Sequence, residues 1–458
     1  MNPPIGSFWD KPSLVWGREA GEGEVADAVS PLGPTIQQFR LLSDAELDDL
    51  FAARPAVPPI DLTGPCQRLA EILEERRDAV LTTMRLANGF SSKDCQEMLE
   101  GALQLIREFN PATSPLTEPI PFGKRQIELA RVPFGTIAVV LPQNAFLLLC
   151  LTCLLSALST GNRIILRAPT VAGRSAGALA RALVEAGFDP RSFSIVVCDA
   201  RRFIGKLLTS PQKPLLHFMG GSRRGAALLS QTFDAGCPCI VDGDGNGWVY
   251  IDEDYDPVLA ASEMWQGAIR YSGQTCTSVN GVFVHPAIDA PFRAALRDLV
   301  AGTPSGKNDE PIGPLFSADQ SAYFEEAIQA SGGRIGRNGH VVDSVMPGTL
   351  IEDPFWESSI VSEGLFAPAL WVRTGEYSDL VDRWPLNRYP MTAGVLSYSI
   401  EQQRVATDLT GAARIVMNGD PSIEHVLEPW GGYPSSGLNP VGPWVDKYTR
   451  VVQIDREL

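Results

Sequence analysis

The sequence predicts an α/β fold in which parallel strands are joined by crossover helices, and three observations support this. Short β-rich runs alternate with helical runs from about residue 132 to residue 235, the order that parallel sheets require. A second block of mixed strands and helices follows from Trp248 to about Ile400. Residues 116–131 read as strand, turn and strand, with Gly123 and Lys124 at the turn, which indicates a hairpin outside both blocks.

Each element is assigned from the spacing of its apolar residues. Residues 1–60 carry several prolines and glycines and little periodicity, so we expect an irregular arm with one short helix at Asp44–Ala52. Spacings of three and four predict helices between Pro65 and Phe109, broken at Gly89. The first block contains predicted strands within 135–142, 161–169, 192–200 and 214–221, and predicted helices at Ala145–Ser159, Ala172–Glu185, Arg202–Leu208 and Arg224–Phe233. The second block contains predicted strands within 281–286 and 368–374 and a predicted helix at Ala290–Ala301.

Composition excludes several classes of protein. The 458 residues carry 38 Lys and Arg against 54 Asp and Glu, a net charge of −16, which argues against a general nucleic-acid or anionic-membrane surface. The first 30 residues show no secretory signal, and the longest apolar stretch, Ala145–Leu158, is too short to span a bilayer. The eight cysteines lack the spacing of metal ligands. We therefore expect a cytoplasmic protein with reduced thiols and no metal site.

Two polar positions are candidates for chemistry. Cys276 stands among small and polar residues in Tyr271–Thr277, directly after a predicted helix. A thiolate exposed there would be a strong nucleophile, and the alternative is a buried structural cysteine. Asn144 follows a predicted strand at the start of a helix. It could cap that helix, or its amide could stabilise a developing oxyanion.

A third candidate is the turn Gly220–Gly225, which closes one predicted strand and opens the next helix. The common dinucleotide and nucleoside-triphosphate fingerprints are absent from the chain. Free backbone N–H groups at this turn would suit a phosphate, although an ordinary turn has the same pattern.

Taken in order, these segments resemble the aldehyde dehydrogenase superfamily. The resemblance rests on six segments, GQTC at 273–276, LPQN at 141–144, ILRAPT at 165–170, HFMGGSRRG at 217–225, SEGLFAPAL at 362–370 and PWGGYPSSG at 429–437. It implies a Rossmann-like NAD(P)-binding domain over 1–115 and 132–243 and an α/β catalytic domain over 244–445. It also implies a hairpin-based oligomerisation arm at 116–131 and 446–458, and hence a homodimer or homotetramer.

The same resemblance implies roles for individual residues. Cys276 would be the nucleophile, and Asn144 would form the oxyanion hole with the backbone N–H of Cys276. Arg167 and Thr170 replace a Lys and a Glu that hold the adenosine ribose in NAD-preferring members, which favours NADP(H) over NAD(H); alternatively, Arg167 only covers the adenosine. The implied cofactor-binding residues are Leu141, Pro142, Arg167, Pro169, Thr170, Gly220, Gly221, Ser222, Gly225, Glu363 and Phe366.

One departure decides which branch of the superfamily is expected. Hydrolytic members carry a Glu in E-L-G-G that activates water, and the corresponding stretch here, 240–247, contains no Glu. Asp242 aligns best with this Glu and is also a candidate catalytic residue. Because Asp is one methylene shorter than Glu, its carboxylate would sit about 1.5 Å further back than that of the Glu. The stretch looks more like acylating branches. The longer stretch Asp242–Glu253 satisfies the EF-hand calcium expression, yet a breaker and a strand precede it where a helix is needed.

The expected activity is therefore NAD(P)H-dependent reduction of an acyl thioester to an aldehyde, or its reverse, through a thioester on Cys276. The acyl donor would be acyl-CoA or an acyl carrier protein. The first alternative is NAD(P)-dependent oxidation of an aldehyde to a carboxylic acid, with Asp242 or a bound water chain as the base. The second is a cofactor-binding relative without catalysis.

Overall fold

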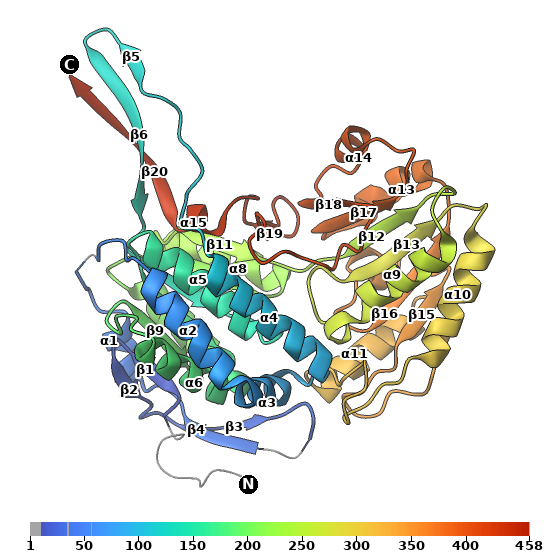
Figure 1. Cartoon of the computed structure of the whole chain (residues 1–458), viewed down its shortest axis with the longest axis horizontal. Helices are drawn as coiled ribbons and strands as arrows, with labels where there is room; N and C mark the ends of the chain where they lie inside the picture. Colours follow the sequence, from blue (N-terminus) through green and yellow to red (C-terminus); the bar gives the residue numbers. More distant parts are fainter. Residues whose placement is uncertain (1–10, 34–35, 56, 458) are drawn as a thin grey trace.

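The computed structural model describes residues 11–33, 36–55 and 57–457, which form two sheet-centred lobes and a projecting arm (Figure 1). The sheet of the first lobe has eight strands in the order β19-β11-β10-β7-β8-β9-β1-β2. Its strands are β1 (Ser13–Val15), β2 (Arg18–Ala20), β7 (Thr136–Val140), β8 (Arg163–Ala168), β9 (Phe193–Val197), β10 (Leu215–Met219), β11 (Cys239–Asp242) and β19 (Gly437–Leu438). The five strands from β11 to β9 pair in parallel, which confirms the predicted α/β class.

Helices cover both faces of this sheet, because its strands are apolar on both sides. Val139 and Leu166 pack with one set of helices, whereas Val140 and Ile165 pack with the other. The first set comprises α2 (Thr63–Glu75), α3 (Arg77–Asn88), α4 (Ser92–Glu108), α5 (Phe146–Ser159) and α6 (Gly173–Glu185). The second comprises α1 (Asp44–Leu50), α7 (Ala200–Thr209) and α8 (Ser222–Ala235). The predicted break at Gly89 is confirmed, since Gly89 ends α3 at a φ of 77°.

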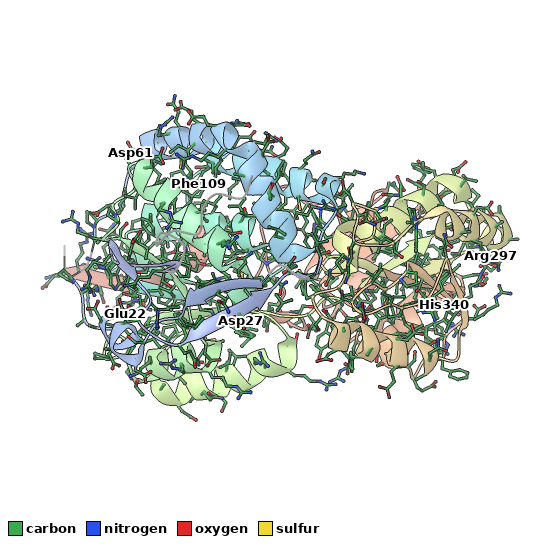
Figure 2. The ribbon with its side chains drawn as sticks, turned by 90° about the horizontal axis from the view of Figure 1, so that it is seen from below. Glu22, Asp27, Asp61, Phe109, Arg297 and His340 are labelled. Atoms are coloured by element: carbon green, nitrogen blue, oxygen red, sulfur yellow. The ribbon has the colours of Figure 1, made fainter. Side chains whose placement is uncertain are left out.

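The second lobe has a seven-stranded sheet in the order β14-β15-β16-β13-β12-β17-β18, in which only β14 runs antiparallel to its neighbour. Its strands are β12 (Gly247–Ile251), β13 (Val279–Val284), β14 (Arg334–Arg337), β15 (Thr349–Glu352), β16 (Ala369–Thr374), β17 (Thr392–Leu396) and β18 (Arg414–Met417). One face packs on α9 (Pro257–Ile269) and α10 (Asp289–Gly302), and the other on α11 (Ala318–Gln329), α12 (Ser359–Ser362), α13 (Tyr377–Arg383) and α14 (Gln402–Asp408). Figure 2 shows the lobes side by side, with Asp61 and Phe109 on the first and Arg297 and His340 on the second.

From residue 11 on, the described part of the N-terminal segment is more regular than the predicted irregular arm, whereas residues 1–10 lie outside the described residues. β1 joins the first sheet antiparallel to β9, where the amide of Val197 donates to the Ser13 hydroxyl at 2.9 Å. β3 (Val25–Val29) and β4 (Ile36–Arg40) form a separate hairpin. These strands have only three to five residues, too few for an alternating pattern to stand out. The predicted helix is confirmed as α1, which Ser43 and Glu46 begin with a capping box.

The predicted hairpin is present as β5 (Ile120–Phe122) and β6 (Arg125–Pro133), with Gly123 at a φ of 61° in the turn. β6 also pairs with β20 (Thr449–Glu457), so three strands extend away from the first lobe (Figure 1). The chain passes from the first sheet to the second between β11 and β12, and β19 later returns to the first sheet. The division at 243/244 and the role of the arm remain proposals. Within the described ranges, no helix is long and apolar enough to cross a membrane.

Candidate active site

The crevice beside β7 is the natural binding position in the first sheet. β8 follows β7 on one side and β10 lies on its other side, and open parallel sheets bind ligands at such a reversal, beyond the carboxyl ends of the strands. β7 leads into Leu141 and Pro142, and the amide of Leu141 donates to the Arg167 carbonyl at 3.1 Å. β10 leads into Gly220 and Gly221. These two segments, which are predicted to bind the cofactor, therefore both lie beyond the carboxyl ends of strands in the first sheet.

Cys276 lies on a backbone turn that is conformationally strained. Tyr271, Ser272 and Gly273 follow one another at φ values of 53°, 57° and 68°, and a left-handed non-glycine residue typically costs about 1–3 kcal/mol. A side chain on Gly273 could not fit, because its Cβ would lie 2.1 Å from the Ala367 carbonyl oxygen. The turn is thus built against the segment that follows α12.

Buried hydrogen bonds hold this turn in place. The Ser272 hydroxyl accepts from the amide of Gly313 at 2.9 Å. The Gln274 side chain donates to the Pro314 carbonyl at 3.4 Å and accepts from the amide of Phe316 at 3.2 Å. Because Ser272 and Gln274 are fully buried, these bonds fix the backbone from which Cys276 projects.

Three further segments meet at Cys276. A Cβ on Gly245 would lie 1.7 Å from the Cys276 carbonyl oxygen, so the loop between β11 and β12 lies directly against the cysteine. A Cβ on Gly364 would lie 2.9 Å from Asn246, which brings the segment after α12 to the same place. Asn144 donates from Nδ2 to the Gln274 carbonyl at 2.9 Å, and its second amide N–H remains for another acceptor. The structure therefore brings Asn144 and Cys276 together.

The surroundings of Cys276 are acidic. Its side chain is half-buried, and burial, followed by the nearby carboxylates of Glu424 and Asp242, raises the pKa of the thiol far above its usual value. The thiol is therefore protonated at neutral pH, and it must lose its proton to a base before it can act as a nucleophile.

Asp242 lacks the freedom that a base for water needs. Its carboxylate accepts from Asn439 Nδ2 at 2.5 Å and Trp430 Nε1 at 3.3 Å, and its other oxygen lies 2.6 Å from His217 Nε2. Burial opposes ionisation, but His217, Asn439 and Lys447 outweigh it and lower the pKa of Asp242. The geometry does not support the predicted catalytic role, because both oxygens are engaged and the carboxylate is a weaker base than usual.

Sequence reasoning missed Glu424. This residue lies in the loop that follows β18, and the nearby Thr277 hydroxyl lowers the pKa of its carboxyl group, which burial raises. Among the charged groups that raise the pKa of the Cys276 thiol, Glu424 has the largest effect. Glu424 belongs to none of the six segments of the resemblance, and only the missing Glu at 240–247 indicated that a carboxylate from elsewhere could be needed.

The ribose side of the predicted cofactor site contains Arg167. Its Nε and Nη2 donate to the Cys198 carbonyl at 3.1 and 3.0 Å, so the guanidinium is anchored at the end of β8, half-exposed. Pro169 and Thr170 follow in a short 3-10 turn, and Thr170 is also half-exposed. These residues fit a nucleotide whose ribose lies beyond β8, with at least one guanidinium nitrogen still free to bind an anion.

The phosphate side has the expected backbone and an unexpected carboxylate. A Cβ on Gly225 would lie 2.4 Å from Val241, so this glycine lets α8 approach β11 closely. The amide of Ser222, in the first turn of α8, donates to Asp244 Oδ2 at 2.7 Å, and the amide of Asp244 donates back to the Ser222 hydroxyl at 2.8 Å. The turn fits a phosphate, but Asp244 places a negative charge beside it.

The remaining predicted residues lie around this crevice. Glu363 accepts from Arg223 at 2.8 Å and Arg388 at 2.6 Å, so its carboxylate joins α8 to the second lobe. Phe366 is half-buried and packs near Phe316, with ring centroids 6.4 Å apart. Their roles toward a cofactor remain predictions.

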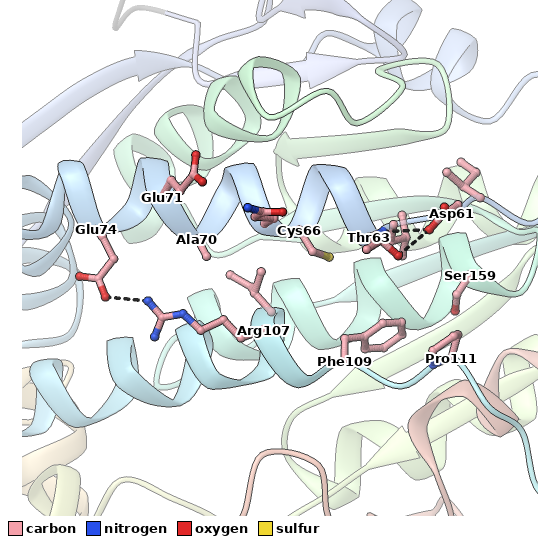
Figure 3. Close-up of a pocket in the computed structure, with 14 residues that line it drawn as sticks. Asp61, Thr63, Cys66, Ala70, Glu71, Glu74, Arg107, Phe109, Pro111 and Ser159 are labelled. Carbon is pink, nitrogen blue, oxygen red and sulfur yellow. Dashed lines mark hydrogen bonds and ion pairs between the residues drawn. The ribbon is translucent and has the colours of Figure 1, made fainter.

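Two other features carry no chemistry. β11 leads into the calcium-like stretch Asp242–Glu253 and β12 runs through it, whereas an EF-hand loop joins two helices. A groove of about 620 Å³ lies between α2 and α4 (Figure 3). It contains Cys66, whose thiol pKa burial raises to about 11, and the 2.9 Å ion pair of Glu74 with Arg107. The residues that line this groove include neither Cys276 nor Asn144.

Comparison with known proteins decides the family. The aldehyde dehydrogenase family profile matches residues 51–454. The chain belongs to the aldehyde dehydrogenase family. A benzaldehyde dehydrogenase of Bacillus subtilis is 23% identical over 441 residues, covering 90% of this chain and 88% of its own. Aldehyde dehydrogenase [NAD(P)+] 2 of Saccharomyces cerevisiae is 24% identical over 479 residues, covering 96% and 93%.

Solved structures agree on the fold of the aldehyde dehydrogenase family. An NADP-dependent enzyme of E. coli superposes with a TM-score of 0.87 at 20% identity, over 98% of this chain and 99% of its own. Betaine aldehyde dehydrogenase of Staphylococcus aureus in complex with NAD+ gives 0.87 at 18% identity, over 98% and 95%. The family, the fold and the use of NAD(P) are confirmed. The predicted similarity to acylating branches is not confirmed, since the relatives are named as aldehyde dehydrogenases. The predicted preference for NADP(H) is not confirmed either, since one solved structure is named as NADP-dependent and another is a complex with NAD+.

Proposed function

We propose that this chain oxidises an aldehyde to a carboxylic acid, with NAD(P)+ as the hydride acceptor and Cys276 as the nucleophile. The observation that supports the proposal is the fixed turn that carries the half-exposed Cys276 thiol, two residues after the Gln274 carbonyl that the Asn144 amide binds. Relatives named for benzaldehyde oxidation and for NAD(P)+-dependent aldehyde oxidation cover 90% and 96% of the chain, which supports this activity over thioester reduction.

The chain's own residues account for the chemical steps. The Cys276 thiol first loses its proton to water, which its half-exposed position admits. The thiolate sulfur then adds to the aldehyde carbon, and the resulting oxyanion accepts from the Asn144 side chain and the Cys276 backbone N–H. A bound oxidised nicotinamide would take up the hydride from that carbon. The thioester that remains on Cys276 is then hydrolysed to the acid, and its half-exposed position gives water access.

The charge around the thiol indicates a substrate class. Glu424, Asp242 and Asp244 all lie close enough to Cys276 to raise the pKa of its thiol. An aldehyde that carries its own carboxylate would be repelled by these groups. We therefore infer that neutral or cationic aldehydes are better substrates than anionic ones.

Product analysis tests the proposal. The enzyme is mixed with a panel of aldehydes and NAD+ or NADP+, with and without coenzyme A, and reduced cofactor and free acid are quantified. We expect sustained formation of both products without the thiol. The locked Asp242 favours one rival, acyl transfer to coenzyme A or a carrier thiol, which would give a single burst without the thiol and turnover only with it. No reduced cofactor under any condition would indicate a relative without catalysis.

A further inference from the structure

Hydrolysis of a thioester on Cys276 requires a group that takes a proton from water. Asp242 is engaged by three side chains, and Asp244 accepts from the amide of Ser222. Glu424 is the remaining carboxylate among the groups that raise the pKa of the Cys276 thiol. Glu424 keeps an exposed surface although many protein atoms surround its carboxyl group, so water can reach it.

The loop that carries Glu424 is anchored to β18 and to α9. Arg414 of β18 donates to the carbonyls of Pro421 and Ile423, both at 2.7 Å. The Asp420 side chain accepts from the amide of Ser422 at 2.8 Å. The same side chain fills the space beside Gly267 of α9, where a Cβ would lie 2.5 Å from it. These contacts hold the loop between β18 and the helix that precedes the Cys276 turn.

In this anchored loop, the Glu424 side chain lies near Thr277 of the cysteine segment. The hydroxyl of Thr277, the residue next to Cys276, lies near enough to the Glu424 carboxylate to lower its pKa. Thr277 is buried, so its hydroxyl is a fixed donor. This contact places the carboxylate near the residue that follows Cys276, and acceptor positions on the carboxylate remain open to water.

We propose that Glu424 is the general base that activates the hydrolytic water in this enzyme, in place of a carboxylate at the end of β11. In this step the Glu424 carboxylate takes one proton from water, and the water oxygen forms a bond to the thioester carbonyl carbon. The carbon–sulfur bond then breaks, its electron pair stays on the Cys276 sulfur, and the sulfur recovers a proton. The products are the carboxylic acid and the free thiol, with no change of oxidation state. This inference rests on the proposed oxidation of aldehydes to acids.

The charges around Glu424 suit the role. Burial among surrounding protein atoms raises the pKa of its carboxyl group to about 7. Glu428 on the same loop also raises it, whereas Thr277, Arg414 of β18 and Arg270 before the cysteine turn lower it. A base with a pKa near the working pH combines availability with proton affinity. The rate of hydrolysis should therefore rise with pH through about 7 as Glu424 loses its proton.

The test separates acylation from deacylation and needs no cofactor. 4-Nitrophenyl acetate acylates a reactive thiol and releases 4-nitrophenolate, so the burst reports acylation and the steady rate reports hydrolysis of the acetyl-enzyme. For Glu424→Gln we expect the steady rate to fall by about 10²–10⁴-fold. The acetyl-enzyme should then accumulate, as a mass increase on Cys276, and the residual rate should lose its dependence on pH near 7.

The matched control is Glu428→Gln, the same chemical change four residues along the same loop. Glu428 pairs with Arg414, so this variant reports disturbance of the loop. It should keep a steady rate within about threefold of the unmodified enzyme, with the pH dependence shifted to lower pH. Glu424→Asp should restore part of the rate, because a carboxylate remains.

Other outcomes contradict the proposal in distinct ways. An unchanged steady rate in Glu424→Gln would exclude Glu424 as the base for water. A slower burst with an unchanged rate of deacetylation would show that Glu424 only deprotonates the thiol. Equal losses in Glu424→Gln and Glu428→Gln would show a structural role for the loop. If the unmodified acetyl-enzyme is stable to water and decays only with coenzyme A, the proposed function itself fails.

Discussion

Asp242 connects three parts of the chain through its carboxylate. His217 comes from β10, Trp430 and Asn439 come from the segment around β19, and Lys447 lies close by at the base of the arm. The amine of Lys447 in turn donates to the Asn439 side chain and the Trp430 carbonyl, both at 2.7 Å. This buried network stabilises the junction between the first sheet and the C-terminal segment.

Asp242→Asn should therefore affect stability more than hydrolysis. Loss of a buried, hydrogen-bonded charge costs about 2–4 kcal/mol, while the acetyl-enzyme should decay at a similar rate, because Glu424 is unchanged. The folded state lowers the pKa of Asp242, so its stabilisation is present above its unfolded pKa of about 3.9 and is lost as the pH falls through its folded pKa. Denaturant unfolding at several pH values measures both effects, and a steep loss of hydrolysis with unchanged stability would contradict them.

The sequence was informative about single residues only where a motif surrounds them. Cys276 and Asn144 follow strands or helices in short patterns, and the structure brings them together. Glu424 stands alone in a loop and reaches the site only because β18 pairs beside β17, far along the chain from Cys276. Asp242 was located correctly at the end of β11, but its partners come from positions 217, 430 and 439, which no local pattern reveals.

The first turn of α8 differs from an ordinary phosphate-binding helix N-terminus, because a carboxylate already occupies one of its backbone amides. Anions bind at helix N-termini because free amides and the helix dipole attract them. Here Asp244 already accepts from the amide of Ser222, and Arg223 is paired with Glu363. A dinucleotide phosphate at this turn would have to share or replace the Asp244 carboxylate.

Asp244→Asn should bind NAD(P)+ more tightly, because the amide oxygen can still accept from Ser222 but no longer repels a phosphate. A charge in the first turn of a helix contributes about 0.3–1 kcal/mol, so we expect roughly a two- to fivefold lower Kd by titration calorimetry. Asp254→Asn is the control, since Asp254 also accepts from a backbone amide, that of Tyr398, on the second lobe. Unchanged or weaker binding in Asp244→Asn would contradict the prediction.

The elements were predictable to the extent that they are long and apolar. Helices α5, α6 and α10 lie within one residue of their predicted bounds, since continuous apolar faces mark them. The strands β1 and β2 were missed because three residues cannot show a period of two. β19 was missed for the same reason, and its two residues pair with β11 from almost 200 positions away.

In the whole molecule, the arm formed by β5, β6 and β20 has edge strands that no other strand of the same chain covers, within the described residues. β5 and β20 are the two edges of its three-stranded sheet. Four large apolar side chains on it are exposed, namely Ile120 (56%), Phe122 (67%), Val451 (48%) and Ile454 (42%). Open edges with apolar side chains are usually covered by another chain. We infer that copies of this chain pair through the arm.

Light scattering at micromolar concentration should therefore give the mass of a dimer or tetramer. The double variant Val451→Asp and Ile454→Asp should shift it toward the monomer, since the charges would be buried at the contact. Val342→Asp is the control, because Val342 is 62% exposed on the second lobe, away from the arm. A monomeric mass for the unmodified chain would contradict the inference.

The proposed chemistry begins at Cys276, and direct identification of the acyl-enzyme tests this role. The enzyme is mixed with an aldehyde and oxidised cofactor, quenched in acid within the first turnover and analysed by peptide mass mapping. We expect one acyl group on Cys276, none on the other seven cysteines, and no adduct or turnover in Cys276→Ala, with cofactor binding intact. Reduced cofactor formed by Cys276→Ala, or an acyl group on any other residue, would contradict it.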